Sequence, residues 1–127
     1  MLPALMKKKI LIVEDEEPLR LLYEEELKEE GYDVLTACNG KEALLRVDTE
    51  KPDLIILDIV MPVMDGMEAL GRIVGKDRKI PIILNTSYPE YRQDFMSWAA
   101  DDYVVKSADL GELKVKICKL LEKPRSC

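Results

Sequence analysis

Short apolar runs alternate along this chain with longer segments in which apolar residues recur every three or four positions. The short runs have the length and the valine and isoleucine content of β-strands, and the longer segments have the period of amphipathic helices. The predicted strands span residues 8–13, 33–37, 53–57, 80–84 and 102–105. The predicted helices span residues 18–30, 40–50, 66–75, 91–99 and 110–121. The first helix carries one apolar stripe, formed by Leu19, Leu22, Tyr23 and Leu27.

Local signals agree with this alternation. Pro18 suits the first turn of a helix, and Gly31 suits the position that follows a last turn. The run at residues 54–57 is apolar at every position, which is typical of a parallel strand buried on both faces. Five strands alternating with five helices predict an α/β fold. We expect a single doubly wound parallel sheet, covered by helices on both faces and connected by right-handed crossovers.

Three of the predicted strands run into side chains that can carry chemistry. Glu14 and Asp15 follow the first strand, Asp58 follows the third, and Lys106 follows the fifth. In an open parallel sheet, ligands bind beyond the carboxyl ends of the strands. We therefore expect these four side chains to meet at one edge of the sheet.

The predicted cluster contains three carboxylates and one ammonium group, so negative charge is in excess. Two carboxylates ~5 Å apart repel each other by roughly 3 kcal/mol at an effective dielectric constant near 20. Such a site favours the uptake of a proton or a cation. A few carboxylates, with oxygen ligands only, suit Mg²⁺ better than Ca²⁺.

Composition limits the classes of protein that the chain can represent. Its 127 residues are the size of one domain, which we expect to span residues 7–123, with flexible termini at 1–6 and 124–127. The net charge of −6 and the isoelectric point of about 4.8 argue against direct nucleic-acid binding, which normally needs a basic surface. No apolar run approaches the ~18 residues that cross a bilayer, so we expect no membrane association.

The chain has no histidine and three cysteines. Without histidine, the chain itself cannot form a Ser-His or Cys-His catalytic pair or a histidine metal site. Cys38, Cys118 and Cys127 are odd in number and show no Cys-x-x-Cys spacing. This pattern argues against a disulfide framework or a zinc site and favours a reducing compartment, so we expect a cytoplasmic protein.

Four segments together resemble the receiver domain of two-component response regulators. They occur in the order of that family, and the resemblance extends over residues 7–122. It implies a flavodoxin-like sheet with the strand order 2-1-3-4-5. The segments are ILIVEDE at residues 10–16, DIVMPVMDG at 58–66, PIILNTS at 81–87 and YVVK at 103–106.

The resemblance implies a magnesium site beside a phosphorylated side chain. Asp58 corresponds to the family's phosphoacceptor. Asp15, Asp58 and the backbone carbonyl of Val60 would bind Mg²⁺ directly, and Glu14 would hold the ion mainly through water. A carboxylate nucleophile next to a divalent cation suits phosphoryl transfer from a phosphohistidine.

Three further positions correspond to the family's catalytic and switch residues. Thr86 would donate a hydrogen bond to a phosphoryl oxygen, and Lys106 would pair with another. Tyr103 corresponds to the aromatic residue that turns inward when the threonine moves. The resemblance therefore implies a conformational switch that local charge controls.

The implied function is that of a receiver in a two-component phosphorelay. Asp58 would accept a phosphoryl group from a sensor histidine kinase or a phosphotransfer protein, and the domain would then control an unidentified downstream protein. The family uses the face formed by its fourth helix, fifth strand and fifth helix for partners, which leaves a homodimer through that face open. The sequence also leaves open whether this chain acts alone or is one piece of a longer regulator.

Two other classes of function compete with this interpretation. One is a receiver-like interaction module that works without phosphorylation. The weaker alternative is a phosphohydrolase with an aspartyl-phosphate intermediate, because such enzymes usually carry a second aspartate where this chain has Val60. In the family, the positions of Val60 and Tyr88 flank the path of the hydrolytic water. We therefore expect at most self-phosphorylation from small phosphodonors, followed by slow self-dephosphorylation.

Two residues depart from the family's pattern. Asn85 occupies a strand position that is commonly apolar, and its amide needs hydrogen-bond partners if it is buried. Ser107 follows the lysine, where the family usually has proline. The second departure makes the placement of Lys106 the least predictable part of the site.

Overall fold

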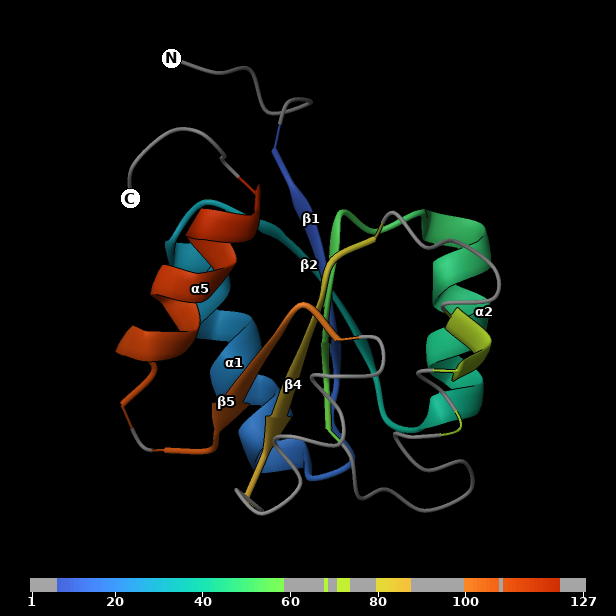
Figure 1. Ribbon diagram of the computed structural model, residues 1–127, viewed down its shortest axis with the longest axis horizontal. Helices are drawn as coiled ribbons and strands as arrows, with labels where there is room; N and C mark the ends of the chain where they lie inside the picture. The colour runs from blue at the N-terminus through green and yellow to red at the C-terminus, as the bar shows by residue number, and fades with distance from the viewer. Residues whose placement is uncertain are drawn as a thin grey trace.

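The structure is a computed structural model that describes residues 7–58, 68, 71–73, 80–87, 100–107 and 109–121. The strands are β1 (Lys9–Val13), β2 (Asp33–Ala37), β3 (Leu54–Leu57), β4 (Ile82–Thr86) and β5 (Asp102–Val105). The helices that these ranges describe from end to end are α1 (Glu17–Glu29), α2 (Gly40–Glu50) and α5 (Gly111–Leu121) (Figure 1).

The five strands form one parallel sheet in the order β2-β1-β3-β4-β5. This arrangement confirms the predicted fold class and the strand order that the resemblance implied. All the strands run the same way, so their carboxyl ends lie together at one edge, at the bottom of Figure 1. The order reverses between β1 and β3, which is the place where such sheets bind ligands.

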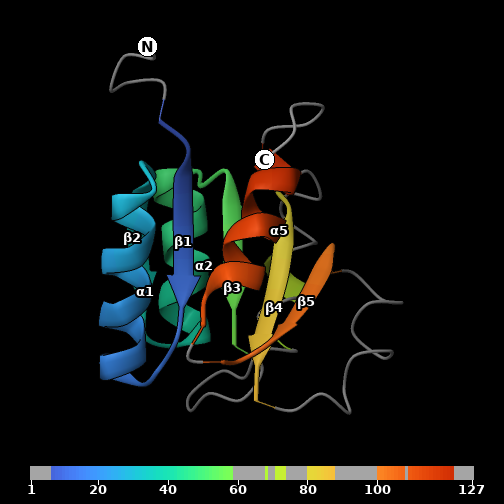
Figure 2. The ribbon, with the colours of Figure 1, turned by 90° about the vertical axis from the view of Figure 1, so that its left-hand side faces the viewer.

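Helices cover both faces of the sheet. Helices α1 and α5 lie on one face and α2 lies on the other (Figure 1), and a view from the side of α1 and α5 shows these two helices in front of the strands (Figure 2). Lys114 on α5 links the pair, because its Nζ is 2.7 Å from Glu26 Oε1 on α1.

Two apolar clusters hold the helices to the sheet, one on each face. In β1 and β3, successive side chains point alternately into the two clusters, because side-chain direction alternates along a strand. Ile10 and Leu54 belong to the cluster beneath α1 and α5, whereas Leu11 and Ile55 belong to the cluster beneath α2. All four are fully buried. The continuous apolar run predicted for the third strand is therefore explained by burial on both faces.

The observed helix ends follow from particular residues. Helix α1 has proline in its first turn, and the chain leaves it through Gly31, whose φ of 98° is in the left-handed region that glycine tolerates. At the start of α2, the Asn39 side chain accepts a hydrogen bond of 2.9 Å from the Glu42 amide. In return, the Glu42 carboxylate accepts one of 2.7 Å from the Cys38 amide.

The fourth strand begins and ends two residues later than predicted. It spans Ile82–Thr86 rather than residues 80–84, because Pro81 has no amide hydrogen to donate to the ladder and pairing begins at Ile82. This shift places Asn85 and Thr86 inside the strand, where both are buried.

Some expectations fall outside the described residues. Of the helix predicted at 66–75, residues 68 and 71–73 are described and are helical. The helix predicted at 91–99 and the termini at 1–6 and 124–127 are not among the described ranges. The described helices include none that is long and apolar enough to cross a bilayer.

The cysteines differ in state. Cys38 is exposed and free, whereas Cys118 is disulfide-bonded. One such bond is compatible with the expectation that the chain has no framework of several disulfides, because three cysteines can form only one pair within a chain.

Candidate metal centre

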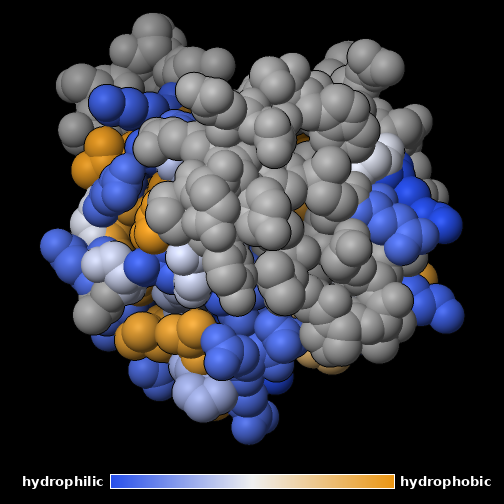
Figure 3. Space-filling view, turned by 60° about the horizontal axis from the view of Figure 1, so that its bottom comes forward, coloured by the Kyte–Doolittle hydropathy of each residue, from blue (hydrophilic) through white to orange (hydrophobic). Residues whose placement is uncertain are grey.

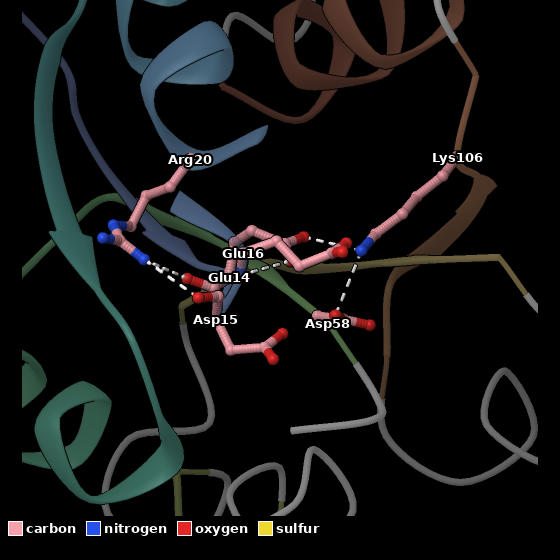
Figure 4. A network of polar contacts seen from close by, with 6 residues as sticks. All are labelled: Glu14, Asp15, Glu16, Arg20, Asp58 and Lys106. Carbon is pink, nitrogen blue, oxygen red and sulfur yellow. Dashed lines mark hydrogen bonds and ion pairs between the residues drawn. The ribbon is translucent and has the colours of Figure 1, made fainter. Parts of the chain in front are cut away.

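Three carboxylates meet where β1 and β3 end. The two strands are neighbours with Val13 paired to Leu57, so the residues that follow them emerge side by side. The Asp58 amide donates to the Val13 carbonyl at 3.1 Å, which fixes this arrangement. Glu14, Asp15 and Asp58 each offer a carboxylate oxygen, and these oxygens lie within 4.8 Å of one another (Figure 4).

Lys106 reaches this group from the far side of β4. Its Nζ is 2.7 Å from Glu14 Oε1 and 3.1 Å from Asp58 Oδ2. Its backbone amide donates to the Thr86 carbonyl at 2.7 Å, which ties the end of β5 to the end of β4. Lys106 therefore bridges two of the three carboxylates.

Burial sets the electrostatics of the centre. Only 1% of Glu14 is exposed, and this burial raises the pKa of its carboxyl group above the ordinary value. The hydrogen bonds that Glu14 accepts from Lys106 and from the Glu16 amide oppose that effect, and the charge of Asp58 adds to it. For Lys106, burial favours the neutral amine, but Glu14 and Asp58 outweigh burial and raise the pKa of the amine.

Glu14 and Asp15, the two acidic residues that follow β1, differ in whether their carboxylate oxygens can bind a cation. Both carboxylate oxygens of Glu14 are engaged, Oε1 by Lys106 and Oε2 by the Glu16 amide at 3.1 Å. Within the described part of the chain, no group hydrogen-bonds to or pairs with the carboxylate of Asp15. Of these two acids, Asp15 is therefore the one with carboxylate oxygens available to a metal ion.

Seen from this edge, the described surface is mostly hydrophilic, with smaller apolar areas (Figure 3). Since carboxylates that close together repel one another, the arrangement suits a hard divalent cation with oxygen ligands. Such an ion would offset the charge that Lys106 leaves uncompensated.

The structure places the other predicted site residues as follows. Thr86 is fully buried at the end of β4, paired with Val105 of β5. Tyr103 is fully buried in the apolar cluster beneath α2. Val60 lies outside the described residues. The sequence therefore brought Glu14, Asp15, Asp58 and Lys106 together correctly, while the roles of Thr86, Tyr103 and Val60 stay predictions.

Two residues near the centre were missed as participants by sequence reasoning. Arg20 of α1 folds back over the loop after β1, where its Nη1 donates to the backbone carbonyls of Glu14 and Asp15 (Figure 4). Tyr23 looks like one more member of an apolar stripe, yet its hydroxyl shares a hydrogen bond with the buried amide of Asn85. That bond supplies a partner for Asn85, which the sequence left without an explanation.

Comparison with known proteins agrees with the fold and the centre. The family model of the response regulator receiver domain matches residues 10–118. The chain is 38% identical over 120 residues to the alkaline phosphatase synthesis transcriptional regulatory protein PhoP of Bacillus subtilis, which covers 93% of this chain and 50% of PhoP. It is also 38% identical over 119 residues to sporulation initiation phosphotransferase F of the same species, which covers 92% of this chain and 96% of that protein.

Solved structures give the same result. The response regulator TrrA from Thermotoga maritima, in complex with Mg²⁺-BeF, has a TM-score of 0.85 and 53% identity over 90% of this chain and 99% of its own. TrrA in complex with the histidine kinase ThkA has a TM-score of 0.84 and 52% identity, covering 91% and 99% of the two chains. The chain belongs to the response regulator receiver family.

These matches confirm the resemblance read from the four sequence segments and place the chain among two-component signalling proteins. The chain spans about half the length of PhoP and of other transcriptional regulators that it matches, and nearly all of sporulation initiation phosphotransferase F. The partners and the output of the protein are therefore matters for proposal.

Proposed function

We propose that this receiver domain, spanning residues 7–123, accepts a phosphoryl group on Asp58 with the help of Mg²⁺. The observation that carries the proposal is the meeting of Glu14, Asp15 and Asp58 within 4.8 Å, with Lys106 in contact with two of them. The relative TrrA has been solved with Mg²⁺-BeF, which supports the same ion here.

The proposed metal ligands are those that the resemblance to the receiver family implies. Asp15 and Asp58 would bind the ion directly, with the backbone carbonyl of Val60 as a third protein ligand. Both oxygens of Glu14 already accept hydrogen bonds, which supports a role for Glu14 through water. When bound, the ion supplies positive charge next to the phosphoryl oxygens.

The transfer itself uses groups of this chain. A carboxylate oxygen of Asp58 attacks phosphorus, the P–N bond to the donor imidazole breaks, and its electron pair returns to the ring nitrogen, which takes up a proton. Lys106, which contacts Asp58 Oδ2 before the reaction, would pair with a phosphoryl oxygen afterwards. Thr86 would donate its hydroxyl hydrogen to a second phosphoryl oxygen, and Tyr103 would change its packing in response.

The donor proposed here is a histidine kinase or a phosphotransfer protein. The histidine must come from the donor, since this chain contains none, and the complex of TrrA with the kinase ThkA supports a kinase partner. The output is proposed to be control of a downstream protein rather than direct contact with nucleic acid, because the chain is acidic. Homodimer formation through β5, α5 and the helix predicted at 91–99 is part of the proposal.

Phosphorylation of the intact chain tests this proposal. The protein is incubated with acetyl phosphate and Mg²⁺, and the phosphorylated fraction is measured by mass spectrometry. Asp58→Asn is expected to remove the phosphorylated species, as is omission of Mg²⁺. Asp33→Asn, which changes an exposed acid at the other end of the sheet, is expected to leave it unchanged. Equal phosphorylation of Asp58→Asn and wild type would contradict the proposal.

We also propose that the acyl phosphate is hydrolysed slowly, because Val60 cannot orient a water molecule and Tyr88 can screen the phosphoryl group. Val60→Asn is expected to shorten the lifetime of the phosphorylated protein. An unchanged or longer lifetime in that variant would count against the idea.

A further inference from the structure

Arg20 binds the backbone of Glu14 and Asp15 and forms no ion pair with their carboxylates. It lies in the first turn and a half of α1, and its side chain turns back toward the end of β1 (Figure 4). Its Nη1 donates to the Glu14 carbonyl at 2.9 Å and lies 3.4 Å from the Asp15 carbonyl. The side chain is only 19% exposed, so these contacts are largely shielded from water.

The choice of acceptors is unusual for an arginine beside carboxylates. A guanidinium group pairs strongly and often bidentately with carboxylate oxygens. Among the described residues, the carboxylate that forms an ion pair with it is that of Glu17, at 4.0 Å, outside the acidic cluster. The carboxylate of Asp15 points away from Arg20 (Figure 4). Arg20 therefore adds positive charge near the cluster without occupying an oxygen that a metal ion needs.

Lys106 and Arg20 thus act on the cluster in different ways. Lys106 occupies carboxylate oxygens of Glu14 and Asp58, so a ligand at those oxygens has to compete with it. Arg20 fixes two successive peptide carbonyls, and with them the direction in which the Asp15 side chain leaves the backbone.

We propose that Arg20 is a positioning residue for metal binding: by anchoring the carbonyls of Glu14 and Asp15, it holds the free carboxylate of Asp15 toward the ion. This inference rests on the proposed Mg²⁺ site. Residues that orient metal ligands typically change metal affinity by about 10–100-fold when they are replaced.

Two substitutions separate positioning from charge. Arg20→Lys keeps the positive charge, but the lysine donor is one bond closer to the backbone and lacks the planar fork, so it cannot reproduce the arginine contacts. Arg20→Gln removes both the charge and the reach. If Arg20 acts by position, Arg20→Lys weakens Mg²⁺ binding by about tenfold, the lower end of the range for such residues. Arg20→Gln also weakens binding, though by less, because the loss of a positive charge favours the cation.

The measurement is a Mg²⁺ titration of the full chain, followed by amide chemical shifts in ¹⁵N-labelled protein. Only folded molecules contribute to the resolved resonances, so a less stable variant still yields an affinity. Arg72→Lys and Arg72→Gln are the matched controls, because Arg72 is exposed and pairs with Glu68 on its own helix. Both controls are expected to keep the wild-type affinity.

A second readout needs no metal. In Mg²⁺-free protein, ¹⁵N relaxation of the Asp15 and Glu16 amides is expected to show greater mobility in Arg20→Lys than in wild type. Wild-type affinity in Arg20→Lys, or tighter binding in Arg20→Gln, would overturn the positioning role even if both variants lost thermal stability. Absence of any Mg²⁺ response in wild type would instead overturn the proposed metal site, and the positioning role with it.

Discussion

Replacing Asp15 with asparagine is expected to stabilise the metal-free protein, against the usual direction of point mutations. The Asp15 carboxylate has an oxygen within 4.8 Å of oxygens of Glu14 and Asp58, and no cation in the described residues pairs with it. At an effective dielectric constant near 20, each such pair repels by about 3 kcal/mol. Because Asp15 is partly exposed, solvent screens much of this energy, and we expect a net gain of about 1–2 kcal/mol.

The assay is urea unfolding of wild type and Asp15→Asn, first with a chelator and then with increasing Mg²⁺. Without metal, the variant is expected to have the larger free energy of unfolding. With Mg²⁺ at ten times the dissociation constant, wild type should gain about 1.4 kcal/mol by mass action, whereas the variant, lacking a ligand, should gain little. As the Mg²⁺ concentration rises, the free energy of unfolding of wild type should therefore approach or exceed that of Asp15→Asn.

Glu25→Gln is the matched control, since it removes the same charge from an exposed position on α1. Its stability is expected to stay within about 0.5 kcal/mol of wild type at every Mg²⁺ concentration. If Asp15→Asn were no more stable than wild type in the presence of chelator, the claim that these carboxylates repel one another in the folded protein would be wrong.

Two further predictions concern buried polar groups. Burial raises the pKa of Glu14 above its unfolded value of 4.5, so the stability that Glu14 contributes is present below pH 4.5 and is lost as pH rises through the folded-state pKa. Between these two pKa values, the free energy of unfolding of metal-free wild type should therefore fall relative to that of Glu14→Gln. Parallel pH curves for the two proteins would refute this. Tyr23→Phe should lower the free energy of unfolding by about 1–2 kcal/mol, because it leaves the Asn85 amide without the tyrosine hydroxyl. Adding Asn85→Leu should restore much of this loss. If Tyr23→Phe lowered the free energy of unfolding by the same amount with Asn85 and with Leu at position 85, the hydrogen bond would be contradicted.

The sheet and the acidic cluster could be predicted because each follows from a repeating pattern. Strands alternating with helices allow few arrangements, and a parallel sheet brings its strand ends to one edge. The positions of Asp58 and Lys106 right after apolar runs were therefore enough to place them together, without knowledge of any contact. The distances, and the bridging of Glu14 and Asp58 by Lys106, needed coordinates.

The helix periodicity was less informative about individual side chains. Tyr23 and Leu27 are buried as the apolar stripe of α1 predicts, but Leu22 is 39% exposed. Residues four apart lie on one face of a helix, whereas neighbours are separated by about 100° around its axis, so Tyr23 and Leu22 cannot both face the core equally. A hydrophobic pattern also cannot show that a buried tyrosine hydroxyl meets an asparagine on a strand 62 positions later.

Arg20 was invisible to sequence reasoning for a different physical reason. Its acceptors are backbone carbonyls, which every residue has. The contact therefore cannot be predicted from the types of the side chains in the sequence. The contact exists because the chain turns sharply between β1 and α1 and presents two carbonyls to a helix residue only five positions after Asp15. Charge complementarity in the sequence would instead have paired Arg20 with a carboxylate. That ion pair would have occupied the carboxylate oxygens that the proposed metal site needs.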